Sequence, residues 1–564
     1  MIASLLLLSH AFALDATTIE TAVSKEIDRA MAGLQLPEQA QPHHISVVIS
    51  DGNYAVAWAQ DGAIIGGETG PSQFARVDVR VGTSAFDNGN FWPPMGIPNG
   101  ITTRGLAHEV NEVAIRRELW LAIDRAYKGA TQAFVAKEAA REGRDGPFTA
   151  DLGEADALVQ DHAAHTPPSL DKLTARIHTV SLAVSGDLHL EDSLVDGNAW
   201  SSMDLMQNNA GTRAWIPSST AIVRAEVLGR ARDGARLRNT RSWIAKDQAH
   251  LPTTEEMASE LKAASSWIAG LVDAPVEEDY LGPVLFEPLA SAELFRQLLH
   301  PEICGTPPLE SAPENQDKDS RPIPVARLGR RLLPQGWSVT DNPTGNSELA
   351  SYYTHDHEAV PAKAVNVIED GVLKDVLMSR VPRSDRSQST GHGRSSGKSR
   401  RNAMPAQVTV QPARSRRASA LRRTALKHAR SAGLPYVLVV RRLTPPALSE
   451  EIEFAFTGDG PLQGLTVPSE VIRLYQDGRE EPVRGLRFSG VDRRTLRDII
   501  AAGPTEAPLE QMDDSLAGGR FSIQKFGGMP VSWAVPAVVI GEMELRGSSG
   551  GEDRVIPAPT PVKP

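Results

Sequence analysis

Residues 360–374 read Val-Pro-Ala-Lys-Ala-Val-Asn-Val-Ile-Glu-Asp-Gly-Val-Leu-Lys, and they carry the clearest folding signal in the C-terminal half of the chain. Two largely apolar runs, residues 364–369 and 372–378, flank the dipeptide Asp370-Gly371. Aspartate followed by glycine is a common turn between strands, because glycine reaches the positive φ values that a tight turn needs. The stretch therefore predicts two short strands joined by a turn.

The same pattern continues on both sides of this stretch. Beyond residue 330 the apolar runs are short and separated by Gly/Asp turns, and the clearest of them are residues 407–411, 436–441, 471–476 and 535–545. Upstream, residues 281–286 form a short apolar run, residues 290–299 have helical spacing, and the proline-rich residues 307–322 are predicted to be a loop. The sequence thus predicts a β-rich C-terminal domain over residues 279–548.

The N-terminal part predicts an antiparallel meander with helices. Residues 17–31 have helical spacing, and strand-like runs follow at residues 45–50, 54–58 and 76–81. Turn-forming residues separate the runs, first Asp51-Gly52-Asn53 and then Asp61-Gly62. We therefore expect an N-terminal α+β domain at residues 14–105.

Residues 106–278 are expected to form a middle region. Residues 108–141 have helical spacing; they open with His108-Glu109, which imitates the start of a zinc motif but lacks a second histidine and is interpreted as a helix start. Strand-like runs at residues 176–184 and 221–227 precede a helical run at residues 254–267. With residues 549–564 as a tail, the predicted fold class is α+β.

Length, charge and cysteine content narrow the classes of function. A chain of 564 residues is too long for one hydrophobic core, and its net charge of −11 does not suggest a nucleic-acid binder. Its one cysteine, Cys304, excludes an intramolecular disulfide and any zinc site that needs two thiolates.

The first 13 residues have the pattern of a secretory leader. An apolar stretch at residues 5–8 is followed by Ala11-Phe12-Ala13, a small-x-small cleavage signal. The stretch is too short to span a bilayer, and no other segment is apolar enough to do so. We expect a signal peptide at residues 1–13 and an exported protein, or a cytoplasmic one if these residues are instead a buried helix.

Several segments of the C-terminal half together resemble the TldD/PmbA family. The most distinctive is the opening stretch at residues 360–374, and the others are residues 282–287, 329–334, 338–344, 391–394, 475–478 and 482–485. The resemblance implies a C-terminal domain of the TldD/PmbA type and an ancestral metallopeptidase that cleaves unfolded peptides inside a closed chamber. It also implies pairing of a metal-bearing subunit with a related subunit that lacks the metal.

The metal motif of that family is degenerate in this chain. Active members carry HExxxH on a helix and a distant cysteine, which bind zinc and supply a general base. The corresponding stretch here is His300-Pro301-Glu302-Ile303-Cys304-Gly305, and the corresponding late stretch, residues 526–530, has no cysteine. We therefore expect no zinc cofactor, with His300 and Glu302 as the remnant of the catalytic site.

A rebuilt site remains an alternative. Alternating residues of an extended segment share a face, so His300, Glu302 and Cys304 could meet one ion or support hydrolysis. The competing interpretation is a loop that ends a helix and contains a partly buried thiol.

A second group of polar residues lies near the glycine-rich stretch. The resemblance implies a peptide-binding cleft beside Gly391-His392-Gly393-Arg394, so His392, Arg394, Asp356 and Glu358 are the expected substrate-binding residues. Arg394 is expected to be exposed and able to take a peptide carboxylate in a bidentate pair. His355 and His357 could share one face of a strand and bind a metal, although a solvated strand end is the simpler interpretation.

Residues 380–430 hold 14 Lys or Arg and a single acid, Asp385. Such a segment could bind phosphates, but it holds no aromatic residue for base stacking. It is interpreted as a solvated loop that pairs with the acidic remainder of the chain, not as a nucleic-acid site.

The sequence therefore predicts a TldD/PmbA-like protein that holds a peptide or an unfolded protein segment without zinc catalysis of its own. A homodimer or a heterodimer with a related chain is the expected assembly. The alternatives are an active hydrolase with the rebuilt site and a noncatalytic binding protein of the cell envelope.

Overall fold

A computed structural model describes residues 16–106, 111–144, 148–311, 326–395, 400–446, 465–513 and 528–547. The predicted signal peptide (1–13), His108-Glu109 and the tail (549–564) lie outside these residues. Within them, no helix has both the length and the apolar character needed to cross a bilayer.

The N-terminal half is built on one long antiparallel sheet of seven strands. Its path runs β4-β2-β1-β6-β7-β5, with β8 also paired to β7. The strands are β1 (Pro42–Gln60), β2 (Ala63–Val81), β4 (Ile101–Gly105), β5 (Val159–Gln160), β6 (Leu190–Asn208), β7 (Arg213–Arg230) and β8 (Arg236–Ala245). The sheet thus takes strands from both sides of the boundary that the sequence suggested at residues 105/106.

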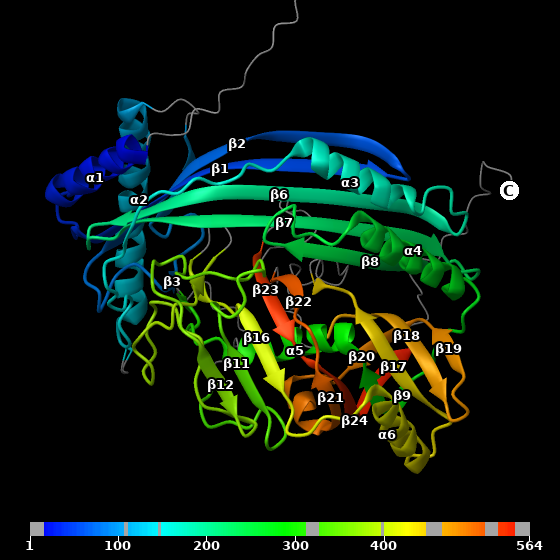
Figure 1. Ribbon diagram of the computed structural model, residues 1–564. Helices are drawn as coiled ribbons and strands as arrows, with labels where there is room; N and C mark the ends of the chain where they lie inside the picture. Colours follow the sequence, from blue (N-terminus) through cyan, green and yellow to red (C-terminus); the bar gives the residue numbers. More distant parts are fainter. Residues whose placement is uncertain are drawn as a thin grey trace, which may run out of the picture.

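Side-chain alternation gives this sheet two different faces. Odd-numbered residues of β1, such as Ile45 and Val47, are fully buried against helices, as are Val77 and Val79 opposite them on β2. Even-numbered residues point to the other face, because successive side chains of a strand alternate. That second face carries the charged and polar residues and turns toward the C-terminal domain (Figure 1).

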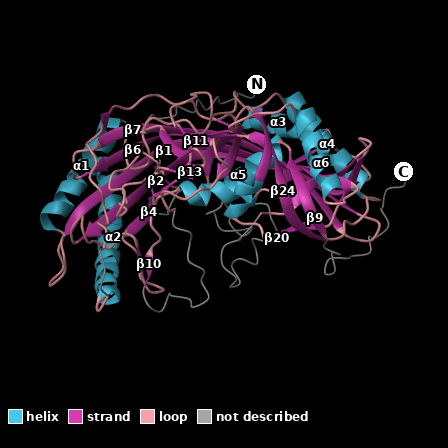
Figure 2. Ribbon diagram, turned by 90° about the horizontal axis from the view of Figure 1, so that it is seen from below, coloured by secondary structure: helices cyan, strands magenta, loops and turns pink. Residues whose placement is uncertain are grey.

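Four helices cover the apolar face. They are α1 (Ala16–Gly33), α2 (Glu112–Arg141), α3 (Leu170–Leu182) and α4 (Thr254–Leu271). The first two share one core with β1, β2 and β6, and the last two share another with β6, β7 and β8. Figure 2 places α1 and α2 at one end of the molecule and α3 and α4 at the other.

Two local predictions in this half were wrong. The run at residues 176–184 lies mostly in helix α3, because Leu173, Ile177 and Val180 follow helical spacing and are buried, while Ser169 caps the first turn. Asp51-Gly52-Asn53 is not a turn, since β1 passes straight through it. Gly52 serves close packing instead: a Cβ there would lie 2.6 Å from the Cβ of Ser202 on β6.

The C-terminal half is β-rich, as predicted, and holds two larger sheets. One runs β13-β12-β11-β16-β23-β22 and the other β19-β18-β17-β9-β24-β20, with β21 also paired to β24. The first comprises β11 (Ser338–Asp341), β12 (Val365–Glu369), β13 (Val372–Leu373), β16 (Gln407–Gln411), β22 (Leu509–Asp513) and β23 (Met529–Ala534). The second comprises β9 (Tyr280–Phe286), β17 (Tyr436–Leu443), β18 (Pro468–Tyr475), β19 (Glu480–Val483), β20 (Leu486–Ser489), β21 (Ile499–Thr505) and β24 (Pro536–Gly547).

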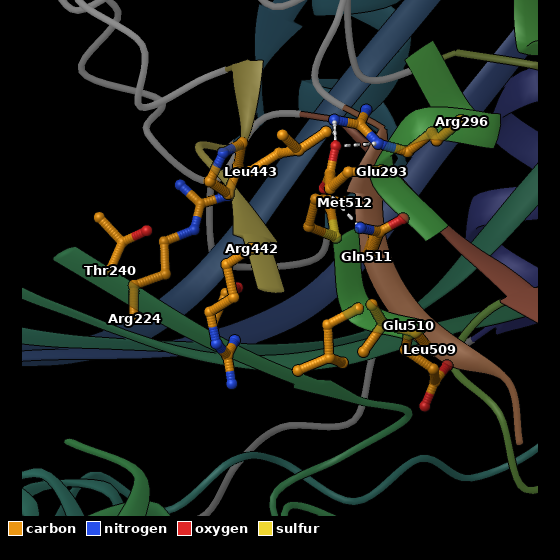
Figure 3. A pocket seen from close by; sticks show the side chains of 13 residues that line it. Arg224, Thr240, Glu293, Arg296, Arg442, Leu443, Leu509, Glu510, Gln511 and Met512 are labelled. Carbon is orange, nitrogen blue, oxygen red and sulfur yellow. Dashed lines mark hydrogen bonds and ion pairs between the residues drawn. The ribbon is translucent and has the colours of Figure 1, made fainter. Parts of the chain in front are cut away.

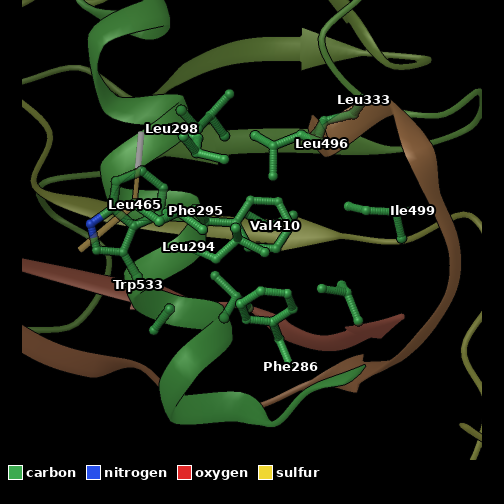
Figure 4. Packing of buried hydrophobic residues seen from close by; sticks show 14 of the residues in the cluster. Phe286, Leu294, Phe295, Leu298, Leu333, Val410, Leu465, Leu496, Ile499 and Trp533 are labelled. Atoms are coloured by element: carbon green, nitrogen blue, oxygen red, sulfur yellow. The ribbon is translucent and has the colours of Figure 1, made fainter. Parts of the chain in front are cut away.

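Helix α5 (Pro288–Ile303) lies between these two sheets and organises the core. Its apolar residues Leu294, Phe295 and Leu298 pack among strand residues such as Phe286 and Trp533 (Figure 4). The predicted hairpin around Asp370-Gly371 is present as β12 and β13, and Gly371 adopts a φ of 75°. The remaining elements are short: β3 (Phe91–Trp92), β10 (Glu310–Ser311), β14 (Gly393–Arg394), β15 (Asn402–Ala403) and the 3-10 helix η4 (Arg493–Asp498).

The basic segment at residues 380–430 is not a solvated loop. It contributes β14, β15 and β16 and the helix α6 (Ala418–Ser431), whose Leu421, Ala425 and Ala429 are buried. One of its arginines, Arg394, is buried inside the domain. The density of charge concealed this, because the apolar residues of α6 are few and fall at helical spacing between basic ones.

Candidate functional site

Helix α5 presents a polar face opposite its apolar one. Glu293, Arg296, Gln297 and His300 follow the i, i+3, i+4, i+7 spacing of one helix face. Arg296 Nη2 donates to Glu293 Oε2 at 2.9 Å, and Gln297 Nε2 donates to the same oxygen at 2.9 Å. The polar face is therefore held in place by its own network.

His300, at the end of this face, is bound to a carboxylate. Its Nδ1 lies 2.8 Å from Oδ2 of Asp513, the last residue of β22, whose side chain is fully buried. Burial by itself would lower the pKa of His300, but Asp513 and the Cys304 thiol, a second hydrogen-bond partner, outweigh it and hold the pKa well above 6.5. The imidazole is therefore protonated at neutral pH and carries an ion pair.

Glu302 points to the other side of α5. Arg493 Nη1 on η4 donates to Glu302 Oε1 at 2.9 Å. The alternative of an extended segment is wrong, because α5 continues through Pro301 to Ile303 and places residues two apart on nearly opposite faces. Pro301 lies inside the helix near its end, where it removes the backbone donor to the Gln297 carbonyl and its ring crowds that carbonyl.

The position of the family's second zinc ligand has no room for a side chain. A Cβ at Gly305 would lie 2.5 Å from Met378 Sδ and 2.8 Å from the Leu377 carbonyl oxygen. Across the described ranges, no three His, Cys, Asp or Glu side chains are grouped so that they could hold a metal ion. The residues of this site do not fit the zinc that the family motif implies.

A pocket of about 90 Å³ opens beside the polar face of α5, between the two halves of the chain (Figure 3). Strands β7 and β8 contribute Arg224 and Thr240, α5 contributes Glu293 and Arg296, and β17 contributes Arg442. Nothing in the sequence signals this pocket, because its walls are brought together from segments more than 200 residues apart.

Strand β22 forms one wall of the pocket. Four successive residues line it, Leu509, Glu510, Gln511 and Met512. Because side chains alternate along a strand, a pocket that all four touch runs along the edge of β22. This strand ends its sheet, and in the described part of the chain these four residues make backbone hydrogen bonds only to β23.

Titratable groups of the pocket are shifted by burial. Burial raises the pKa of Glu510 to about 7, although the Ala350 and Ser351 amides donate to its carboxylate. Burial and the neighbouring Arg241 lower the pKa of Arg442 to about 10. Arg442 nitrogens lie 3.5 Å from Glu470 and 3.8 Å from Glu260, beyond good hydrogen-bond length.

Two of the four predicted substrate-binding residues fasten a loop. Asp356 Oδ1 accepts from the Glu358 and Val360 amides, both at 2.9 Å, and its Oδ2 accepts from the Gly393 amide at 2.8 Å. Glu358 Oε2 accepts from the Arg380 amide at 2.7 Å. Burial and the nearby Glu358 raise the pKa of Asp356 to about 7.

The other two, His392 and Arg394, lie inside the C-terminal domain. Arg394 donates to the Pro405 carbonyl at 2.8 Å and to the Pro530 carbonyl at 2.9 Å. The expectation of an exposed Arg394 was wrong: 3% of the residue is exposed. His392 is fully buried, with Nδ1 beside the Thr390 hydroxyl at 2.9 Å.

His355 and His357 go to different partners. His355 Nδ1 lies 3.2 Å from the Thr354 hydroxyl, whereas His357 Nδ1 lies 3.1 Å from the Ser395 carbonyl. Burial, then Arg394 and Arg401, lower the pKa of His357 to about 3. The two imidazoles therefore do not act together.

These observations agree with comparisons to known proteins. Residues 279–460 match the family model described as the PmbA/TldA metallopeptidase C-terminal domain. The C-terminal half of this chain carries a TldD/PmbA-family domain. A search of curated proteins found no significant match to the sequence.

Solved structures share the fold over nearly the whole chain. A proposed modulator of a DNA gyrase from Thermotoga maritima covers 93% of this chain and 99% of its own, with a TM-score of 0.59 and 13% identity. TldE from Thermococcus kodakarensis covers 93% of this chain and 100% of its own, with a TM-score of 0.58 and 14% sequence identity. A proposed modulator of DNA gyrase from Bacteroides thetaiotaomicron covers 94% of this chain and 98% of its own, with a TM-score of 0.56 and 11% sequence identity. The TldD/PmbA fold thus includes the long N-terminal sheet.

Proposed function

We propose that this protein is a peptide-binding member of the TldD/PmbA family that pairs with a related chain and does not hydrolyse peptides with a zinc ion of its own. The observation that carries the proposal is the state of the α5 site. His300 is held by Asp513, Glu302 is turned away to Arg493, and Gly305 leaves no space for a second ligand. The helix that would carry catalysis is instead closed by ion pairs.

The pocket beside α5 supports peptide binding. An extended peptide can add to the free edge of a strand through main-chain hydrogen bonds, while pockets beside the edge select its side chains or ends. Within the described residues, β22 offers such an edge, and Arg442 offers a guanidinium whose acidic partners lie 3.5 and 3.8 Å away. Main-chain hydrogen bonds between β22 and a peptide do not depend on the sequence of the peptide. This suits a subunit that holds unfolded segments of many kinds.

Two arginines that are neighbours in the chain allow a matched test. Arg442 lines the pocket, whereas Arg441 on the same strand points away to Glu287 and Glu480. Binding of fluorescent, unstructured ten-residue peptides to the full chain should weaken about tenfold or more in Arg442→Ala, the loss of one charge-assisted hydrogen bond. Arg441→Ala should bind as the wild type does. No binding by the wild type, or equal binding by Arg442→Ala, would overturn peptide binding at this pocket.

The absence of zinc catalysis has its own measurement. Elemental analysis after incubation with zinc and desalting should find far less than one zinc per chain. About one zinc per chain, lost in His300→Ala, would contradict the proposal and favour a rebuilt metal site.

A further inference from the structure

A second, smaller cavity lies under the N-terminal sheet, between that sheet and the C-terminal half of the chain. Its volume is about 30 Å³. The sheet contributes His44 on β1 and Asp78 and Arg80 on β2, and the C-terminal half contributes Glu358, Arg380 and Arg401. His357 and Ala359 also line it.

The cationic side chains around this cavity differ in how well they are paired. Arg80 lies 3.3 Å from Asp87 and 3.9 Å from Asp78, and the Arg380 guanidinium donates only to the Gly153 carbonyl, at 2.8 and 3.0 Å. In the described part of the chain, Arg401 has no carboxylate within ion-pair distance, and its buried Nε has no hydrogen-bond partner.

Arginines and acids meet at the cavity, and Asp87 adds a third carboxylate behind Arg80. Three guanidinium groups (Arg80, Arg380 and Arg401) face two carboxylates (Asp78 and Glu358). The two imidazoles add no charge: burial, then Arg80 and Arg380, lower the pKa of His44 to about 3, and the pKa of His357 is lowered to a similar value. A guanidinium that is left without a carboxylate in such a place, as Arg401 is among the described residues, is stabilised by a bound anion.

The backbone around the cavity is held in an unusual conformation. Ala359 has a φ of 59°, in the left-handed region that favours glycine. The hydrogen bonds of Asp356 hold this turn, and Gly393 passes so close that a Cβ there would lie 2.1 Å from Glu358 Oε2. Strained turns that are held firmly by their surroundings are concentrated at binding sites.

We propose that this cavity binds a carboxylate group, through Arg401 with Arg380 and Arg80. Each water-sized group needs about 10–15 Å³, so the cavity has room for the two oxygens of a carboxylate. The planar guanidinium donates two parallel hydrogen bonds to a carboxylate. A small acid and the C-terminus of a peptide both supply this group, and they differ in the atoms attached to the carboxyl carbon.

Thermal unfolding of the full chain in acetate, at constant ionic strength, tests the proposal. A ligand that binds the native state raises the melting temperature, so acetate should raise it in a saturable way while the neutral isostere acetamide does not. Arg401→Gln should weaken the apparent affinity for acetate at least tenfold. Arg414→Gln, at an exposed arginine of the same basic segment, should leave the response unchanged.

A second variant should change the affinity for acetate in the opposite direction. Glu358→Gln keeps an oxygen that can accept from the Arg380 amide but removes one negative charge from the cavity, so it should strengthen acetate binding.

Replacing acetate by a short peptide with a free C-terminus, and by its C-terminal amide, distinguishes a small acid from a peptide C-terminus as the source of the carboxylate. Greater stabilisation by the free-acid peptide than by acetate identifies a chain end. Equal effects of acetate and acetamide, or a wild-type response in Arg401→Gln, would overturn the proposal. Because peptide binding at β22 is read out by Arg442→Ala, the two proposals fail separately.

Discussion

The two ends of the domain interface treat buried charge in opposite ways. At the α5 end, Arg296, His300 and Glu302 each have an ionised partner. At the other end, Arg401 has none in the described part of the chain, and two imidazoles are kept neutral beside it. The charged groups around His300 are therefore closed by ion pairs, whereas Arg401 beside the smaller cavity has no carboxylate partner among the described residues.

Removing the acid at the α5 end should have the largest effect on stability. Asp513→Asn leaves His300, and Arg296 3.7 Å away, without their carboxylate in a buried place. Breaking a buried pair costs about 3–5 kcal/mol, so urea denaturation should show a free energy of unfolding lower by that amount. Asp273→Asn breaks an exposed pair with Arg232 and should leave the free energy of unfolding almost unchanged. Equal losses in both variants would show that the α5 pair is not structural.

The two ends should also respond to pH in opposite directions. The folded pKa of His44 is lowered to about 3, so the unfolded chain binds the proton first and stability falls as the pH drops from 6.5 toward 3. At pH 5 this amounts to about 2 kcal/mol, which His44→Gln should remove. The folded pKa of His300 is raised, so its contribution is complete below pH 6.5 and is lost as the pH rises through the folded value.

The free energy of unfolding of wild type, His44→Gln and His300→Gln, measured between pH 5 and 9, separates the two contributions. The first variant should flatten the acid side of the stability profile, and the second should flatten the alkaline side. A profile of the same shape in all three proteins would refute the assignment of either histidine.

The smallest effect concerns the strained turn at the cavity. Ala359→Gly relieves a left-handed conformation that costs an L-residue about 1–2 kcal/mol, offset in part by the greater freedom of glycine in the unfolded chain. We expect a gain of about 0.5–1 kcal/mol. Ala362→Gly, three residues on and without a positive φ, should instead lose about the same amount. A loss in both variants would mean that Ala359 is not strained.

Patterns among residues that are close in the sequence predicted many of the secondary-structure elements. The hairpin of β12 and β13, the helices α1, α4 and α5, and the β-rich C-terminal half all follow from alternation, helical spacing and turn residues. Resemblance identified the family from segments scattered over the same half. The failures are equally physical: Gly52 resembled a turn residue but serves strand packing, and α6 was hidden by its basic residues.

The candidate site was only half visible in the sequence. Substitution of the zinc motif at Pro301 and Gly305 could be read directly, because that chemistry depends on residue type at a fixed spacing. Nothing in the sequence connects His300 with Asp513, 213 positions later, or Arg401 with His44 and Arg80. Strand order and the stacking of the sheet on the C-terminal domain make these neighbours.

The family, the secondary structure of most segments and the loss of the zinc motif could all be read from the amino-acid sequence, because they depend on neighbours along the chain. Which charges are paired, and which lie beside a cavity, emerged only from the folded arrangement. The reason is that burial and pairing depend on the groups that the opposite wall supplies. At α5 that wall supplies a carboxylate, whereas no carboxylate of the described residues lies within ion-pair distance of Arg401.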